Sequence, residues 1–87
     1  MKKAEIAQAI RWLETFDEKR ARAEYDEMVG TKSGQKWKVE KAREDIIQYK
    51  NKIQGAEILI RSFGYNINAT FYQDGELLRR RYNIEEA

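Results

Sequence analysis

The sequence contains no cysteine and no histidine. Without cysteine the chain has neither disulfide bonds nor thiolate metal ligands. Without histidine it lacks the commonest general base and a frequent metal ligand. These absences remove the usual parts of most hydrolytic and redox mechanisms, and no motif in the chain indicates a cofactor. We therefore predict a protein that is not an enzyme and that binds neither a cofactor nor a metal ion.

Long apolar runs are also missing from the chain. No apolar stretch approaches the roughly 20 residues that a membrane-spanning helix needs. The residues after Met1 form an amphipathic pattern that contains Glu5, Arg11 and Glu14, unlike the apolar segment of a signal peptide. The sequence therefore predicts a cytoplasmic protein without a membrane segment.

A strong net charge is a third absence. The 17 Lys and Arg residues nearly balance the 15 Asp and Glu residues, which leaves a formal net charge of +2. We therefore expect most charges to lie on solvated helix faces. With 87 residues, the chain is long enough for a single domain, 1–87, whose hydrophobic core is marginal unless a second chain adds surface. This size predicts a homodimer.

A heptad pattern is the strongest feature that the sequence does contain. Between residues 35 and 63, apolar residues recur at alternating spacings of three and four. We call these residues the heptad seam: Val39, Ala42, Ile46, Tyr49, Ile53, Ala56, Ile60 and Phe63. Their spacing is that of the a and d positions of a coiled coil, and it predicts a helix over about 35–63 that packs along its length against another helix.

Residues 3–29 predict the other helix. Its first half has one apolar face, formed by Ile6, Ala9, Ile10, Leu13 and Phe16. In its second half the apolar stripe thins, and Asp17, Arg20 and Glu24 project near the seam. A plain charged surface is the interpretation we favour for these three residues. The alternative is a partly buried polar layer that fixes the register of the helices or the choice of partner.

A short polar loop, 30–34, is expected between the two helices. Gly30 is predicted to end the first helix in a left-handed conformation, and Ser33 is predicted to cap the second. A connection of this length predicts antiparallel neighbouring helices. The fold class is therefore mainly α, a two-helix coiled-coil hairpin in which the C-terminal part of the seam, Phe63 included, packs near Leu13.

The last segment, about 66–83, has a different period. Aromatic and β-branched residues before Asp74-Gly75 predict a small β-hairpin with a type I′ turn, which pairs Phe71 with Leu78 and Ile67 with Tyr82. A short helix over 75–86, with Asp74 as its N-cap, is the alternative. Because an isolated hairpin is barely stable in water, we expect it to pack on the helices or to pair with a second copy of the chain.

Two positions of the second helix fall outside the heptad seam and make its last turns apolar almost all round. These are Ile58 and Leu59, and either the hairpin or another subunit is expected to cover them. Gly55, in the same helix, indicates either a close backbone approach or no constraint at all. Gly64 is placed to end the helix.

Partner binding is the function that this pattern favours. Trp37, beside the predicted loop, is a candidate hot-spot residue, and Ile58 and Leu59 form a candidate apolar surface. We predict a small non-catalytic intracellular protein–protein interaction module, acting as an adaptor, regulator or inhibitor of a partner protein.

Nucleic-acid binding is the alternative function. Two groups of basic residues lie near aromatic side chains, at the start of the second helix and near the C-terminus. They are Lys32, Lys36, Lys38, Lys41 and Arg43, and Arg79, Arg80 and Arg81. Acidic neighbours interrupt both groups, so a solvated surface is the favoured interpretation.

Overall fold

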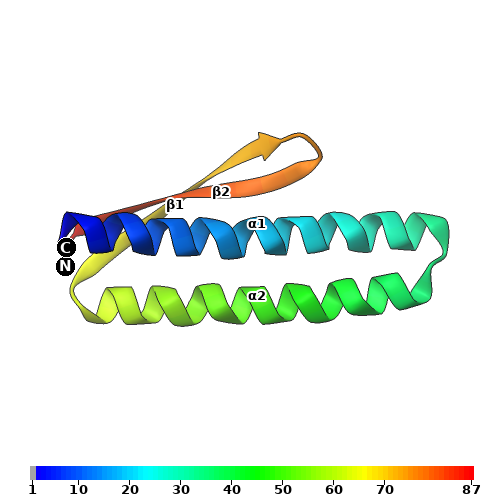
Figure 1. Cartoon of the computed structure of the whole chain (residues 1–87), viewed down its shortest axis with the longest axis horizontal. Helices are drawn as coiled ribbons and strands as arrows, with labels where there is room; N and C mark the ends of the chain where they lie inside the picture. The colour runs from blue at the N-terminus through cyan, green and yellow to red at the C-terminus, as the bar shows by residue number, and fades with distance from the viewer. Residues whose placement is uncertain (1) are drawn as a thin grey trace.

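The computed structural model describes residues 2–87, which form two long helices and a β-hairpin. The elements are α1 (Lys3–Ser33), α2 (Lys36–Ser62), β1 (Tyr65–Asp74) and β2 (Leu77–Glu86). The helices pack antiparallel in a molecule 47 Å long, and the hairpin lies along α1 (Figure 1). This confirms the predicted helical hairpin followed by a small β-hairpin, and the alternative of a C-terminal helix is wrong. Within residues 2–87, no helix is both long and apolar enough to cross a membrane.

The first helix ends at Ser33 and not at residue 29 as predicted. Gly30 is a buried helical residue, and a Cβ atom there would lie 3.0 Å from Cγ2 of Val39, so its bare backbone lets α2 approach closely. Gly34, with a φ of 71°, is the left-handed residue that ends α1. The Ser33 hydroxyl donates a hydrogen bond to the Val29 carbonyl within α1 and does not cap α2.

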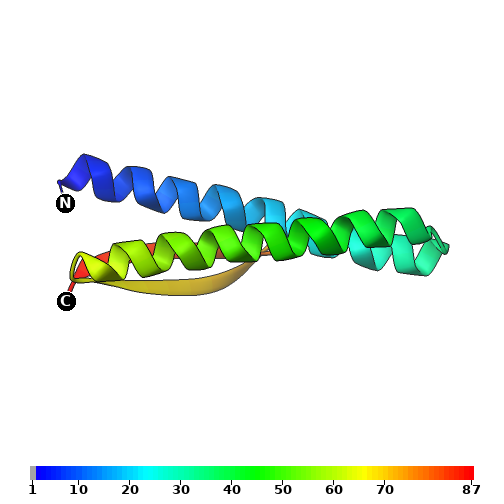
Figure 2. The same ribbon diagram turned by 90° about the horizontal axis from the view of Figure 1, so that it is seen from below.

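The hydrophobic core lies toward the end of the helix pair remote from the loop that joins α1 and α2. Figure 2 shows the two helices diverging toward this end. The buried cluster there combines helix residues with hairpin residues: Leu13, Ile53, Ile60, Tyr65, Tyr82 and Ile84. Phe63, predicted to pack in the seam, is instead 65% exposed. Side chains of the hairpin supply the core at this level in its place.

The register of the β-hairpin differs from the prediction. Ile67 pairs with Ile84 and not with Tyr82, because Asp74 and Leu77 close the turn. Gly75 has a φ of 59°, and no other residue type in residues 2–87 has a positive φ. This is the pattern of a type II′ turn, which has glycine at its first central position. The shift is an even number of residues, so the side chains keep their predicted faces.

The hairpin docks on the helices but leaves the predicted docking residues uncovered. Ile58 and Leu59 are 60% and 58% exposed. Tyr65, Tyr82 and Ile84 of the hairpin belong to the core cluster formed with the seam residues of α2. Because Ile58 and Leu59 lie on other faces of α2 than those seam residues, the hairpin does not reach them.

Gly55 has no structural constraint within the chain, since nothing lies within 4 Å of the position that its Cβ would take. Replacing Gly55 with alanine is expected to raise the free energy of unfolding by about 0.5–1 kcal/mol, because alanine loses less backbone entropy in a helix. Urea denaturation measures the change. The matched control is Gly34→Ala, at a φ of 71°, which is expected to lower stability by about 1–2 kcal/mol. A loss of stability in Gly55→Ala would contradict this assignment.

Candidate interaction site

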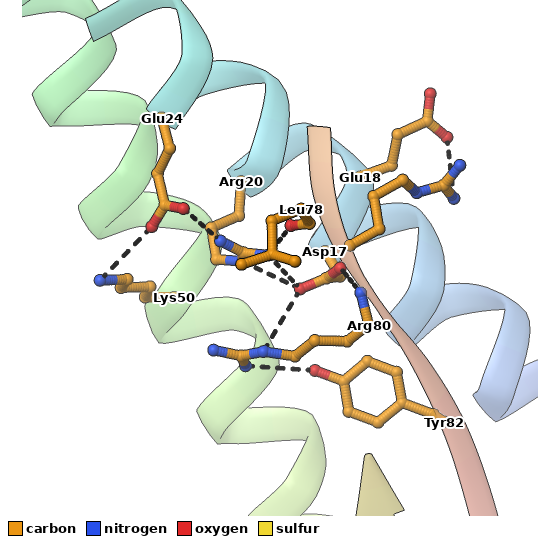
Figure 3. Close-up of polar contacts among 9 residues, drawn as sticks. Asp17, Glu18, Arg20, Glu24, Lys50, Leu78, Arg80 and Tyr82 are labelled. Atoms are coloured by element: carbon orange, nitrogen blue, oxygen red, sulfur yellow. Dashed lines mark hydrogen bonds and ion pairs between the residues drawn. The ribbon is translucent and has the colours of Figure 1, made fainter. Parts of the chain in front are cut away.

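A buried polar network joins α1 to β2. Asp17 and Arg20 are 0% and 3% exposed, and Figure 3 shows them where β2 crosses the helix. Arg20 Nε donates to Asp17 Oδ1 at 2.9 Å, and Arg20 Nη1 donates to Glu24 at 2.6 Å. These three residues form the polar layer that was the less favoured interpretation. Our preference for a plain charged surface was wrong, because the hairpin covers Asp17 and Arg20.

Asp17 and Arg20, together with Glu14 of α1, bind backbone groups on the outer edge of β2, the edge that faces away from β1. The Arg80 N–H donates to Asp17 Oδ2 at 2.6 Å, and the Tyr82 N–H donates to Glu14 Oε2 at 3.0 Å. The Leu78 carbonyl accepts a hydrogen bond from Arg20 Nη2 at 3.1 Å. Edge strands leave such groups without strand partners. Side chains spaced three residues apart on α1 therefore take the place of a third strand and fix the hairpin.

The chain itself supplies partners for most of the network, although Arg80 Nε is buried without a hydrogen-bond partner. The Arg80 guanidinium lies 3.7 Å from Asp17 Oδ1 and 3.5 Å from the Tyr82 hydroxyl. Burial raises the pKa of the Tyr82 phenol above its ordinary value, so the phenol stays neutral near neutral pH. Within residues 2–87, no group of three or more acidic side chains is placed to hold a metal ion. We interpret the network as structural.

An apolar groove lies between α1 and α2, and none of its lining residues comes from the hairpin. The residues that line it are Glu5, Gln8, Ala9 and Trp12 of α1, together with Ala56, Leu59, Ile60 and Phe63, from α2 and its C-cap. Its volume is about 300 Å³. Trp12, Leu59 and Phe63 are 58%, 58% and 65% exposed. They form its walls, while the more buried Ala9, Ala56 and Ile60 form its floor.

Neighbouring positions in the sequence explain how the groove forms. Successive helical residues point about 100° apart, so Leu13 and Ile60 enter the core while Trp12 and Leu59, next to them in the chain, project to one side. An exposed apolar patch with polar residues at its rim marks interaction sites on soluble proteins. Sequence reasoning missed Trp12 and Phe63 as site residues. The available signal was the adjacent apolar pair Trp12-Leu13, which matches Leu59-Ile60.

The three residues predicted to bind a partner do not form one surface. Leu59 lines the groove, whereas Ile58 does not and projects from another face of α2. Trp37, 70% exposed, lies beside the loop between the helices. At the helical rise of about 1.5 Å per residue, Trp37 is about 33 Å from Leu59 along α2. The groove therefore brings Leu59 together with Trp12 and Phe63 instead.

The cations of the nucleic-acid alternative lie in two separate parts of the molecule, near the helix–helix loop and on β2 (Figure 1). Several of them already have partners in the chain. Arg43 lies 3.1 Å from Glu27, Lys41 lies 3.6 Å from Asp45, Arg79 lies 2.8 Å from Asp74, and Arg81 stacks over Tyr72 at 4.8 Å. Arg80 belongs to the buried network. Lys32, Lys36 and Lys38 form no ion pair within residues 2–87. This arrangement does not favour the nucleic-acid prediction.

Comparison with known proteins adds no assignment to these surfaces. No protein-family model, curated protein or solved structure matches the chain. Functional inference therefore rests on the two features described above, the buried polar network and the apolar groove. Of these, the groove presents large exposed apolar side chains, those of Trp12, Leu59 and Phe63.

Proposed function

We propose that the protein is a small non-catalytic protein–protein interaction module, an adaptor, regulator or inhibitor, that binds its partner through the apolar groove between α1 and α2. The supporting observation is the exposure of Trp12, Leu59 and Phe63, each more than half accessible, around one hollow. Burying a large apolar side chain contributes about 1.5–3 kcal/mol. Tryptophan is also enriched among the residues that dominate binding energy.

The chemistry of the groove supports binding over catalysis. Among its eight lining residues, Glu5 is the only one with a charged side chain and Gln8 the only one with an amide. A mechanism of acid–base or nucleophilic type needs a second group within hydrogen-bond reach of the first. The lining offers no such pair, whereas its apolar character suits the core of a protein interface.

Leu59→Asp is expected to abolish partner binding, because it places a charge in the groove wall. Ile58→Asp is the matched control: the two residues are adjacent in α2 and equally exposed, at 58% and 60%, but only Leu59 lines the groove. Tagged versions of both variants and of the unchanged protein are purified from the native cell, and the bound proteins are compared. We expect the partner to remain with Ile58→Asp and to be lost with Leu59→Asp.

The opposite pattern, in which Ile58→Asp loses the partner and Leu59→Asp keeps it, would contradict the proposal. Circular dichroism shows whether both variants keep their helices, as expected for substitutions at exposed sites. Light scattering on the same samples tests the predicted homodimer. The size of the chain suggested this homodimer, and Ile58 and Leu59 were the residues that another subunit was expected to cover.

A further inference from the structure

Two lysines extend the groove along the helix pair. Lys19 lies seven residues after Trp12 in α1, and Lys52 lies seven residues before Leu59 in α2. Seven residues are close to two helical turns, so each lysine lies on the same face of its helix as the groove residue, about 10 Å away. The pair therefore marks one end of the same surface.

Aromatic rings hold both lysines, and no carboxylate neutralises them. The Lys52 ammonium lies 5.2 Å from the ring centre of Tyr49 and 5.8 Å from that of Phe16. The Lys19 ammonium lies 5.7 Å from the ring centre of Tyr49. Within residues 2–87, neither lysine forms an ion pair. Asp26 and Asp45 line a second hollow together with Lys19, but neither acid pairs with it, and Asp45 pairs with Lys41 at 3.6 Å. Two positioned cations without an ion-pair partner thus adjoin an apolar groove.

The shape of this surface suits a helix. The α1 positions Glu5, Trp12 and Lys19 repeat every seven residues, as do Lys52 and Leu59 on α2. A third helix that lies between two antiparallel helices meets side chains at this spacing on both sides. The small residues Ala9 and Ala56 on the groove floor allow a close approach of its apolar side chains.

We propose that the occupant of the groove is an amphipathic helix of a partner protein, with apolar residues that enter the groove and acidic residues about two turns away that face Lys19 and Lys52. This inference rests on the proposed function and adds the chemical class of the partner. Opposite charges across an interface fix its orientation and exclude wrong partners.

A second copy of the chain meets this surface differently in its two possible arrangements. In a parallel arrangement, Lys19 and Lys52 of one copy face the same lysines of the other, which is unfavourable. In an antiparallel arrangement centred on Trp12 and Leu59, Lys19 of one copy faces Glu5 of the other, because both residues lie seven positions from Trp12. Charge therefore disfavours only the parallel arrangement, and the light-scattering outcome described below distinguishes an antiparallel pair of copies from a partner helix.

The test uses the full chain with Trp37→Phe, which leaves Trp12, in the groove wall, as the only tryptophan of the two in the sequence. The probes are two synthetic helical peptides with identical leucine faces. One carries glutamates two turns from the leucines, and the other carries lysines at those positions. We expect the acidic peptide to shift the Trp12 emission and to bind roughly five- to tenfold more tightly, a preference that shrinks with added salt.

Charge reversal on the protein provides the control. Lys19→Glu with Lys52→Glu is expected to remove the preference for the acidic peptide or to invert it. Lys32→Glu with Lys36→Glu makes the same change in net charge near the helix–helix loop, about 30 Å from Trp12 along α1, and is expected to keep the preference.

Each other outcome overturns part of the account. Equal affinity for the two peptides, or a preference that survives in the Lys19 and Lys52 variant, contradicts the acidic partner but leaves groove binding intact. If neither peptide changes the Trp12 emission, both the inference and a helix-binding groove are wrong. A dimer in light scattering that Leu59→Asp dissociates would assign the groove to a second copy.

Discussion

Replacing Asp17 with alanine is expected to lower the free energy of unfolding by about 3–5 kcal/mol. Asp17 is fully buried and accepts hydrogen bonds from Arg20 and from the Arg80 backbone. Its removal leaves a buried guanidinium and a buried N–H group without their acceptor, and such groups are costly in a low-dielectric interior. A domain of this size is stable by only about 5–15 kcal/mol, so urea denaturation measures the loss readily.

Glu18→Ala is the matched control for Asp17→Ala. Glu18 is adjacent in α1 and also pairs with arginines, Arg22 at 3.4 Å and Arg79 at 3.5 Å, but its side chain is 41% exposed. Exposed ion pairs contribute about 0–1 kcal/mol. Amide hydrogen exchange at Arg80 and Tyr82 should accelerate in Asp17→Ala and not in the control. Equal effects of the two substitutions would show that the network does not hold the hairpin.

Replacing Leu13 with alanine is expected to cost about 2–5 kcal/mol, the range for buried leucines that leave a cavity. Leu13 is completely buried, in a core cluster that combines residues of α1, α2 and the hairpin. The substitution therefore weakens the packing of every element at once. Thermal and urea unfolding of the variant both measure the change.

Trp12→Ala tests whether the groove residues contribute to partner binding and not to the stability of the core. Trp12 precedes Leu13 in the chain but is 58% exposed and lines the groove. Its replacement is expected to change the free energy of unfolding by about 1 kcal/mol or less and to weaken partner binding. If Trp12→Ala destabilises the chain as much as Leu13→Ala, then Trp12 is a core residue and the groove is not a free surface.

Helical periodicity was enough to predict the helix pair. The alternating spacings of the heptad seam identified Ala42, Ile53 and Ile60 as buried positions, and they are buried. The end of α1 was predicted wrongly because two glycines, Gly30 and Gly34, flank the same polar stretch. Only the contact of Gly30 with Val39 distinguishes the glycine that packs from the glycine that ends the helix.

The register of the β-hairpin could not be predicted from the local sequence pattern. The predicted register and the observed one place the same side chains on the same face, so alternation does not separate them. The observed register lets Ile84 join the core and brings the Arg80 and Tyr82 N–H groups to Asp17 and Glu14. These contacts join residues more than sixty positions apart in the sequence, and a turn dipeptide carries no information about them.

Burial of the polar residues of α1 depends on the same docking. Asp17 and Arg20 resemble surface residues when α1 and α2 are considered alone, and β2 is the element that covers them. The groove, in contrast, forms because a residue that was expected to be buried stays exposed. Phe63 is a regular seam position by sequence, yet it stays exposed because the core at that level includes Tyr65 and Ile84. Both features follow from where the hairpin docks.

The central claim is that a partner occupies the groove, and residue-resolved NMR of the isotope-labelled chain bound to its co-purified partner tests it most directly. We predict that the largest changes on binding occur at the methyl groups of Ala9 and Ala56 and at the indole of Trp12. Ile47 and Ile58, which are 62% and 60% exposed outside the groove, should change little. Largest changes at Ile47 and Ile58, with the groove signals unmoved, would contradict the account.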